Sequence, residues 1–192
     1  KYGLVELSTR YGDCLMPEII TVDVKELKRK KIMKDTLFSP LLVEKVREAL
    51  SRGEQAILFQ NRRGFAPMIE CRGCGWVPHC VNCDVSLTYH KAHNQLVCHY
   101  CGYTYRLPQV CPECKGTEFK MQGFGTEKVE EEIAGQFPAV KVERLDFDTA
   151  RTRTAYERII SDFEKGKTQI LIGTQMLSKG LDFGNVSVVG IL

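Results

Sequence analysis

The sequence lacks several features that would assign a function class directly. It has no apolar run approaching the ~20 residues that a membrane-spanning helix needs, and no signal-like apolar segment opens it. It also has no Gly-x-x-x-x-Gly-Lys-Ser/Thr loop, so nothing of that kind can hold the β- and γ-phosphates of a nucleotide. The formal net charge of +3 neither demands nor excludes a nucleic-acid partner. With 43% hydrophobic and 27% charged residues in 192, the composition predicts one soluble globular domain with a small appendage.

Cysteine is concentrated in a single stretch. Eight of the nine cysteines and all four histidines lie between residues 71 and 114, and the remaining Cys14 is expected to be structural or incidental. Two thiolates separated by two residues can face one tetrahedral ion. The sequence therefore predicts two structural Zn²⁺ sites built from four CxxC pairs: Cys71/Cys74, Cys80/Cys83, Cys98/Cys101 and Cys111/Cys114.

Two other uses of these cysteines are less consistent with the pattern. A disulfide framework needs an oxidising compartment, and close CxxC pairs are a poor disulfide arrangement but a good chelate. A catalytic zinc usually keeps an open position and mixes in His or carboxylate ligands. His79 and His99 adjoin cysteines and offer substitutes, yet eight cysteines suffice without them. Reduced, metal-bound thiols predict a cytoplasmic protein.

The loop lengths favour a nested pairing of the four CxxC pairs. The 14 residues between Cys83 and Cys98 are enough for a hairpin, so the two middle pairs would share one ion. The outer pairs, Cys71/Cys74 and Cys111/Cys114, would then close around them as the other site. A cross-braced arrangement remains open.

Outside the cysteine stretch, the chain has an α/β rhythm. It predicts a parallel sheet with flanking helices, interrupted by the metal module between a strand and the next helix. Helices are expected at 41–50, after Thr126 as N-cap, and at 151–165. Strands are expected at 18–24, 56–59, 140–145, 169–173 and 186–192. The predicted divisions are a leading segment (1–38), a first α/β part (39–68), the insert (69–120) and a remainder (121–192) that stops inside its last strand, as in an excised fragment.

Several segments offer polar or aromatic groups to a ligand. The segment from Gln60 to Gly64 follows a buried strand, where open α/β sheets bind ligands. The basic run between Lys28 and Lys34 is either a solvated linker or a phosphate contact. Aromatic side chains of the insert either stack on bases or pack around zinc: Trp76, Tyr89, Tyr100, Tyr103 and Tyr105.

Three segments flanking the cysteines together resemble a known family. They are Ile57-Leu-Phe-Gln-Asn-Arg-Arg-Gly-Phe-Ala-Pro67, Gly123-Phe-Gly-Thr-Glu127 and Ile170-Leu-Ile-Gly-Thr-Gln-Met-Leu-Ser-Lys-Gly180. With the cysteine spacing, they resemble the PriA family of bacterial primosomal replication-restart helicases. The resemblance implies the second RecA-like lobe of a superfamily 2 DNA helicase, with a zinc-binding insert whose ligands pair in the nested fashion. It also implies 3′-to-5′ movement driven by ATP and Mg²⁺ in the full-length protein. The implied partners are forked DNA, other primosome proteins and the loader of the replicative helicase.

The resemblance also assigns candidate site residues. By likeness, helicase motif IV comprises Asn61, Arg62, Arg63 and Gly64, and motif V comprises Thr174, Gln175, Lys179, Gly180 and Asp182. Motif V in related helicases lies between the DNA backbone and the nucleotide. The Thr174 hydroxyl and the Lys179 charge suit a phosphate, Gly180 permits close approach, and Asp182 suits orienting the loop. The alternative for this segment is a plain strand-to-helix turn.

The chain departs from the family pattern in what it lacks. The phosphate-binding loop, the Asp-Glu magnesium site and the arginine of motif VI are missing, so no catalytic residue is expected here. We therefore expect this segment alone neither to hydrolyse ATP nor to unwind DNA. Competing interpretations are a zinc ribbon that binds nucleic acid without motor activity, or a chaperone or scaffold module. Chaperones with four CxxC pairs carry a Gly-x-Gly after each pair, which is not found here.

Overall fold

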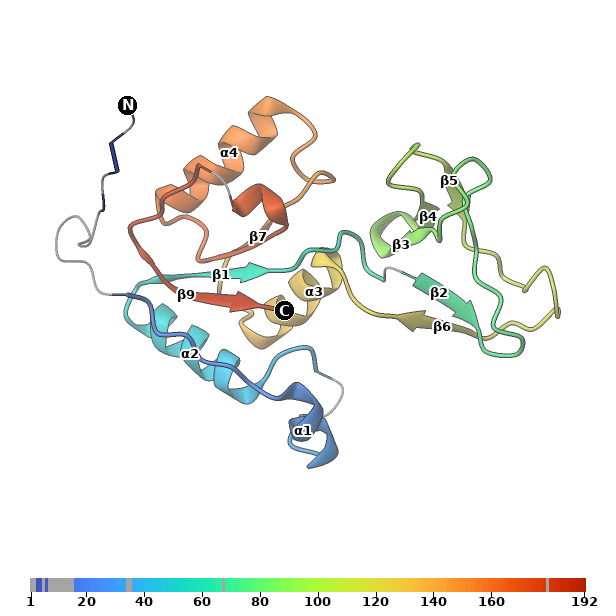
Figure 1. The fold of residues 1–192 in the computed structure, drawn as a ribbon, viewed down its shortest axis with the longest axis horizontal. Coiled ribbons are helices and arrows are strands. Elements are labelled where there is room, and N and C mark those ends of the chain that lie inside the picture. The colour runs from blue at the N-terminus through green and yellow to red at the C-terminus, as the bar shows by residue number, and fades with distance from the viewer. Residues whose placement is uncertain (1–2, 5, 7–15, 34–35, 67, 179) are drawn as a thin grey trace. The chain divides into compact units, whose positions relative to one another are not determined.

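The structure is a computed structural model that describes residues 3–4, 6, 16–33, 36–66, 68–178 and 180–192. The chain forms two compact units, residues 1–34 and residues 35–192. The larger unit contains both an α/β sheet with its helices and a cysteine-rich module (Figure 1). Within the described ranges, no helix has the length and apolarity needed to cross a bilayer.

The described residues of the leading unit form one short helix, α1 (Val24–Arg29). The carboxylate of Asp23 caps it by accepting a 2.9 Å hydrogen bond from the Glu26 backbone N–H. The prediction of a strand at 18–24 is therefore wrong. A β-branched run needs a partner strand to satisfy its backbone groups, and among the described strands none pairs with it. Cys14 and Lys34 lie outside the described residues.

The predicted parallel sheet is confirmed. Its strand order is β7 (Val142–Leu145), β8 (Ile170–Gly173), β1 (Gln55–Phe59) and β9 (Val186–Ile191). Every neighbouring pair runs parallel. In the register of the two central strands, Phe59 lies opposite Gly173. The carboxyl ends of these two central strands, β1 and β8, therefore lie next to each other at the carboxyl end of the sheet.

Three helices cover the two faces of this sheet: α2 (Pro40–Ser51), α3 (Thr126–Gln136) and α4 (Arg153–Glu164). Successive side chains of a strand point to opposite faces. Ile170 and Ile172 accordingly pack with the apolar residues of α2 and α3. Leu171, between them, packs with Ile159 and Phe163 of α4 on the other face. All four residues of β8, a strand in the interior of the sheet, are buried, which explains why the strand is apolar throughout.

The starts of the helices show one success and one error of the sequence prediction. As expected, Pro40 lies in the first turn of α2, and the Ser39 hydroxyl accepts a 3.2 Å hydrogen bond from the Leu42 N–H. For α3, however, Gly125 is the N-cap and Thr126 is the first helical residue. A side chain at Gly125 would meet the carbonyl oxygens of Arg63 and Gly64, so only glycine fits there.

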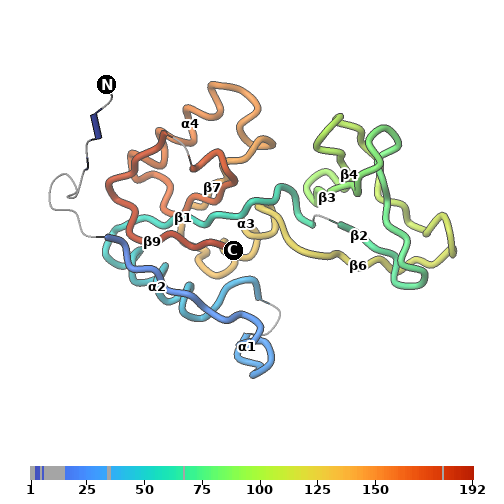
Figure 2. The backbone as a smooth tube through the Cα atoms, viewed as in Figure 1, coloured from blue at the N-terminus to red at the C-terminus, as the bar shows by residue number. Residues whose placement is uncertain are grey.

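The cysteine-rich module lies between β1 and α3, where the sequence predicted an insert (Figure 2). An antiparallel ribbon of β2 (Met68–Cys71) and β6 (Phe119–Gln122) forms its beginning and end. A three-stranded antiparallel sheet follows, made of β3 (Thr88–His90), β4 (Gln95–Val97) and β5 (Thr104–Arg106). Its small core contains buried apolar side chains and two of the cysteines: Ala66, Ile69, Leu87, Tyr89, Leu96, Cys80 and Cys98.

Candidate metal centres and an adjoining cleft

All four CxxC pairs form the same backbone turn. In each, the N–H of the first cysteine donates to the carbonyl oxygen five residues later, at 2.7–2.8 Å. The carbonyl of that cysteine accepts from the N–H four residues later, at 2.9–3.0 Å. The residue directly after the second cysteine has a positive φ in every case: Gly75, Asp84, Gly102 and Lys115. This repeated turn holds both sulfurs of a pair on one side of the backbone.

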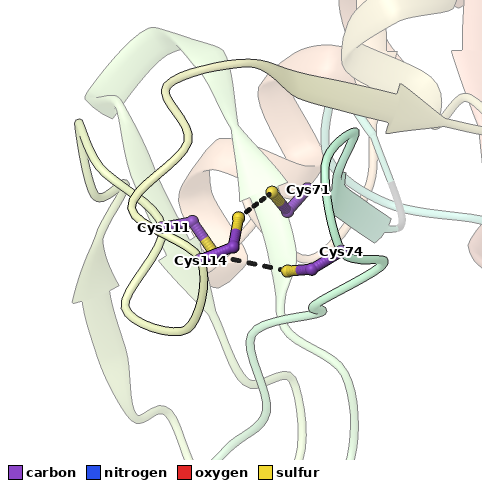
Figure 3. Close-up of side chains that lie close together, drawn as sticks. All are labelled: Cys71, Cys74, Cys111 and Cys114. Atoms are coloured by element: carbon purple, nitrogen blue, oxygen red, sulfur yellow. Dashed lines mark hydrogen bonds between the residues drawn. The ribbon is translucent and has the colours of Figure 1, made fainter.

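The turns bring the eight thiols together in two groups of four. One group contains Cys71, Cys74, Cys111 and Cys114, and the other contains Cys80, Cys83, Cys98 and Cys101. This is the nested grouping, not the cross-braced one. Figure 3 shows the first group, in which the sulfurs of Cys71 and Cys114 are 3.5 Å apart and those of Cys74 and Cys111 are 3.7 Å apart. In the second group, the sulfurs of Cys80 and Cys101 are also 3.5 Å apart.

These distances suit a shared metal ion and not disulfide bonds. A Zn–S bond of about 2.3 Å in a tetrahedron separates neighbouring sulfurs by about 3.8 Å, whereas sulfurs in a disulfide are about 2.05 Å apart. All eight cysteines are free thiols, and within each group every sulfur lies within 4.8 Å of the others. The disulfide framework considered for the sequence is therefore not what the structure has.

Backbone hydrogen bonds prepare one thiol in each group for deprotonation. The N–H of Cys74 helps to lower the pKa of the Cys71 thiol to about 7, and the N–H of Tyr103 helps to lower that of Cys101 to about 6. A neighbouring thiol has the opposite effect: contact with Cys101 raises the pKa of Cys83 to about 12. Four adjacent thiolates repel one another unless a cation neutralises them. The donor set and its spacing therefore fit a thiophilic divalent cation such as Zn²⁺.

The two histidines beside the cysteines take other partners. His79 is half-exposed, with its Nδ1 atom 3.8 Å from a carboxylate oxygen of Asp84. His99 has its Nε2 atom 3.3 Å from Nε2 of His90. Neither imidazole belongs to a thiol group, as the sequence analysis expected.

A cleft of about 710 Å³ adjoins the second thiol group. Part of the lining follows the carboxyl ends of β1 and β8, which bring residues of the two motif candidates together although more than a hundred residues separate them. The rest of the lining comes from the cysteine-rich module. The lining residues are Asn61, Arg62, Arg63, Thr174 and Gln175 from the carboxyl end of the sheet, and Met68, Val85, Ser86, Thr88, His99 and Tyr100 from the module.

The cleft carries positive charge that no internal carboxylate balances. Within the described residues, neither Arg62 nor Arg63 forms an ion pair, and the Arg63 guanidinium lies over the Phe147 ring at 5.3 Å. Burial, together with the nearby Arg63 charge, lowers the pKa of His99 to about 4, so this imidazole is neutral near pH 7. Two guanidinium groups without a carboxylate partner among the described residues, with neighbouring hydroxyl and amide groups, form a suitable surface for an anion.

The other motif candidates lie elsewhere. Gly64 is buried with a φ of +78°, and a side chain there would collide with Thr88 of the module, so its role is to allow close packing. Gly180 and Asp182 are exposed and do not line the cleft. Lys179 lies outside the described residues. Thr174 and Gln175 are thus the motif V candidates that the structure places beside Arg62 and Arg63.

A group of contacts between the module and the α/β part was not predicted. His90 is buried with its Nδ1 atom 3.7 Å from Glu127 and 3.8 Å from Asp148. Next to it, Lys91 forms a 2.6 Å ion pair with Glu131, and the Ala92 N–H donates to Glu127 at 2.8 Å. Burial lowers the pKa of His90 despite the nearby carboxylates. These contacts join distant parts of the chain, and no linear motif indicates them.

Comparison with known proteins agrees with these observations. Residues 80–106 match the model of the PriA DNA helicase Cys-rich region (CRR) domain, and residues 115–192 match that of the helicase conserved C-terminal domain. The whole chain is 44% identical to replication restart protein PriA of Bacillus subtilis and 39% identical to that of Haemophilus influenzae. Over 98% of its length it is 39% identical to that of Synechocystis. The chain spans about a quarter of the length of these relatives, namely 24%, 26% and 23%. The resemblance drawn from the sequence motifs is confirmed.

Proposed function

We propose that this chain is the zinc-bearing segment of a PriA-type DNA helicase that acts in replication restart. In this proposal, it supplies a structural module and a nucleic-acid surface to a motor completed by other segments. The whole enzyme would move 3′ to 5′ at the expense of ATP and Mg²⁺ in the cytoplasm. Its partners would be forked DNA, primosome proteins and the replicative helicase loader. The 44% identity to a replication restart protein over the full chain supports this assignment most directly.

We assign a structural Zn²⁺ ion to each group of four cysteines. When bound, zinc would supply no chemistry to the reaction. It would fix the CxxC turns of a module whose small apolar core cannot by itself keep it folded. Fully metal-loaded protein should contain two Zn²⁺ per chain by elemental analysis. Cys74→Ser and Cys83→Ser, one in each group, should each reduce this to about one. Wild-type protein that folds without metal under anaerobic conditions would contradict the assignment.

We assign DNA-backbone binding to Arg62, Arg63 and Thr174, which follow the carboxyl ends of the central strands β1 and β8. The contacts available there are charge and hydrogen bonds, which bind phosphates without reading bases, as a motor that runs on any sequence requires. This accounts for the motif IV and V candidates of the cleft. It leaves Gly180 and Asp182, on the exposed segment after it, for coupling to the nucleotide site of the whole enzyme.

Salt-dependent binding tests the DNA surface. Single-strand affinity should fall with salt, and log Kd plotted against log salt concentration should have a slope of about 0.7 for each phosphate contact. The double variant Arg62→Gln/Arg63→Gln should lower that slope by about 1.4. Arg153→Gln is the control, because Arg153 is an exposed arginine of α4 that does not line the cleft. Binding to partner proteins but not to DNA would favour the scaffold alternative.

The isolated chain should show no DNA-stimulated ATP hydrolysis. Phosphoryl transfer needs a cradle for the β- and γ-phosphates, a magnesium site and a positive charge on the transition state. We assign these groups to the rest of the enzyme. Measuring phosphate release by the pure chain with and without single-stranded DNA tests this, and a DNA-dependent rate would contradict it.

A further inference from the structure

Tyr100 is an exposed aromatic residue held on a rigid turn. It lies between Cys98 and Cys101, within one of the CxxC turns of the second thiol group, and 83% of its surface is exposed. Two backbone hydrogen bonds close this turn: Cys98 N–H donates to Tyr103 O at 2.8 Å, and Gly102 N–H donates to Cys98 O at 2.9 Å. Across the described part of the chain, the Tyr100 ring and hydroxyl have no hydrogen-bond or ring partner. The turn therefore holds the Tyr100 backbone in place and leaves its ring in solvent, where contact with a ligand would bury apolar area.

The position of Tyr100 narrows what this ring can bind. It lines the same cleft as Arg62, Arg63, Thr174 and Gln175, which follow the carboxyl ends of β1 and β8. A ligand in this cleft can meet positive charge from the sheet residues and an aromatic ring from the module. A single nucleic-acid strand has this composition, with phosphates along one edge and bases along the other. A protein segment would need acidic and apolar groups in the same alternation.

We propose that Tyr100 stacks on a base of a single strand whose phosphates lie on Arg62 and Arg63. This inference rests on the proposed DNA-binding function and adds to it a base-stacking residue on the zinc module. Stacking is tolerant of sequence because every base has an aromatic face, so the contact suits a translocating motor. It also gives the two thiol groups different tasks. Tyr100 lies within the Cys98–Cys101 turn and lines the cleft, whereas no residue of the two turns that hold the Cys71 group lines it.

The test compares two single strands of equal length and charge on the zinc-loaded chain. One is a fluorescent oligothymidylate. The other is an abasic strand, which has the same sugar-phosphate backbone and label but no bases. Wild-type chain should bind the thymidylate more tightly. Tyr100→Ala should weaken thymidylate binding by about 5-fold or more and weaken abasic binding little. Tyr100→Phe should keep the wild-type preference, because it keeps the ring. Tyr105→Ala, a tyrosine of the same module outside the cleft, is the control.

A second measurement separates stacking from phosphate binding. Tyr100→Ala should leave the slope of log Kd against log salt unchanged, since no charge is lost, whereas Arg63→Gln should lower it by about 0.7. Two bound zinc ions and an unchanged melting temperature show that each variant is folded.

Each remaining outcome decides between the two proposals. If wild-type chain binds neither strand at low salt, the proposed DNA surface itself fails. If it binds both strands and Tyr100→Ala weakens both equally, the ring does not stack and only the further inference is overturned. If Tyr100→Ala binds both strands like wild type, the inference is also overturned, and this turn is left for a protein partner.

Discussion

The hydroxyl of Thr126 donates a 2.6 Å hydrogen bond to Oδ2 of Asp146, and both side chains are fully buried. Thr126 begins helix α3 and Asp146 follows strand β7, so this bond joins the two elements beside the module. Burial raises the pKa of Asp146. The Arg144 charge and the hydrogen bonds from Thr126, Thr149 and Asp148 outweigh it and hold the pKa below its usual value. A buried carboxylate is thus kept ionised by a dedicated set of donors.

Thr126→Val should destabilise the chain by about 1.5–3 kcal/mol, the range for losing a hydrogen bond to a charged group. Thr126→Ser, which keeps the hydroxyl, should cost much less. Urea unfolding at pH 7 measures both. Because the pKa of Asp146 is depressed in the folded state, its contribution is present above its unfolded pKa and is lost as the pH falls through the folded value. The difference between Thr126→Val and wild type should therefore shrink in acid, and a constant difference would contradict this role.

Gly125→Ala should destabilise the chain by about 1–3 kcal/mol through overpacking. The backbone there is extended and suits any residue, with φ −121° and ψ −174°. The obstacle is the space, since an added methyl group would meet the carbonyl oxygens of Arg63 and Gly64.

Gly135→Ala is the matched control for that substitution. Gly135 lies within the same helix, and apart from its chain neighbours and the adjacent helical backbone no atom lies within 4 Å of the position of an added methyl group. Alanine at an open helical position should stabilise by about 0.5–1 kcal/mol. Thermal melting of both variants should therefore shift in opposite directions. A melting temperature that falls equally in both would mean that close packing at Gly125 is not the cause.

Acidification should weaken the chain through His90. Burial lowers the folded-state pKa of this imidazole below its ordinary 6.5, although Asp148, Glu127 and Asp146 act in the opposite direction. The unfolded chain then binds the proton more readily, so the free energy of unfolding falls as the pH drops below about 6.5. His90→Gln removes this titration and should make the pH dependence shallower. Urea midpoints between pH 7.5 and 5.5, with zinc content measured at each point, test this; equal slopes would contradict it.

Much of the fold could be predicted because its signals are local. The apolar run Ile170-Leu-Ile172 indicates a strand buried on both faces, and Ser39-Pro40 indicates a helix start; both agree with the structure. The 18–24 strand failed because β-propensity is realised only with a partner, whereas the Asp23 cap acts within its own segment. Thr126 was taken for a cap because its hydroxyl suits that role. Its bond to Asp146, twenty residues away in sequence, could not be read from local pattern.

The candidate site divides in the same way. Spacing alone indicated the cysteine groups, since a CxxC turn is a local structure and eight sulfurs have few partners. The cleft was less accessible to this reasoning. Arg62 and Thr174 lie in one cleft because β1 and β8 are neighbours in the sheet, and the sequence analysis did not predict this strand order. The presence of Tyr100 in the same cleft depends on how the module packs on the start of α3 through Gly64, Gly125 and His90, which no spacing encodes.

The ribbon formed by Met68–Cys71 and Phe119–Gln122 has a consequence for how such a protein can change over evolutionary time. The module leaves and rejoins the α/β part through two paired strands. Because these strands lie side by side, the module occupies no more of the α/β part than a short loop between β1 and α3 would. Cys71 is the last residue of β2, so a metal ion bound by the outer thiol group would hold the far end of the ribbon together. Beyond the outer thiol group, the module can acquire new contacts or lose old ones without disturbing the residues of the parallel sheet.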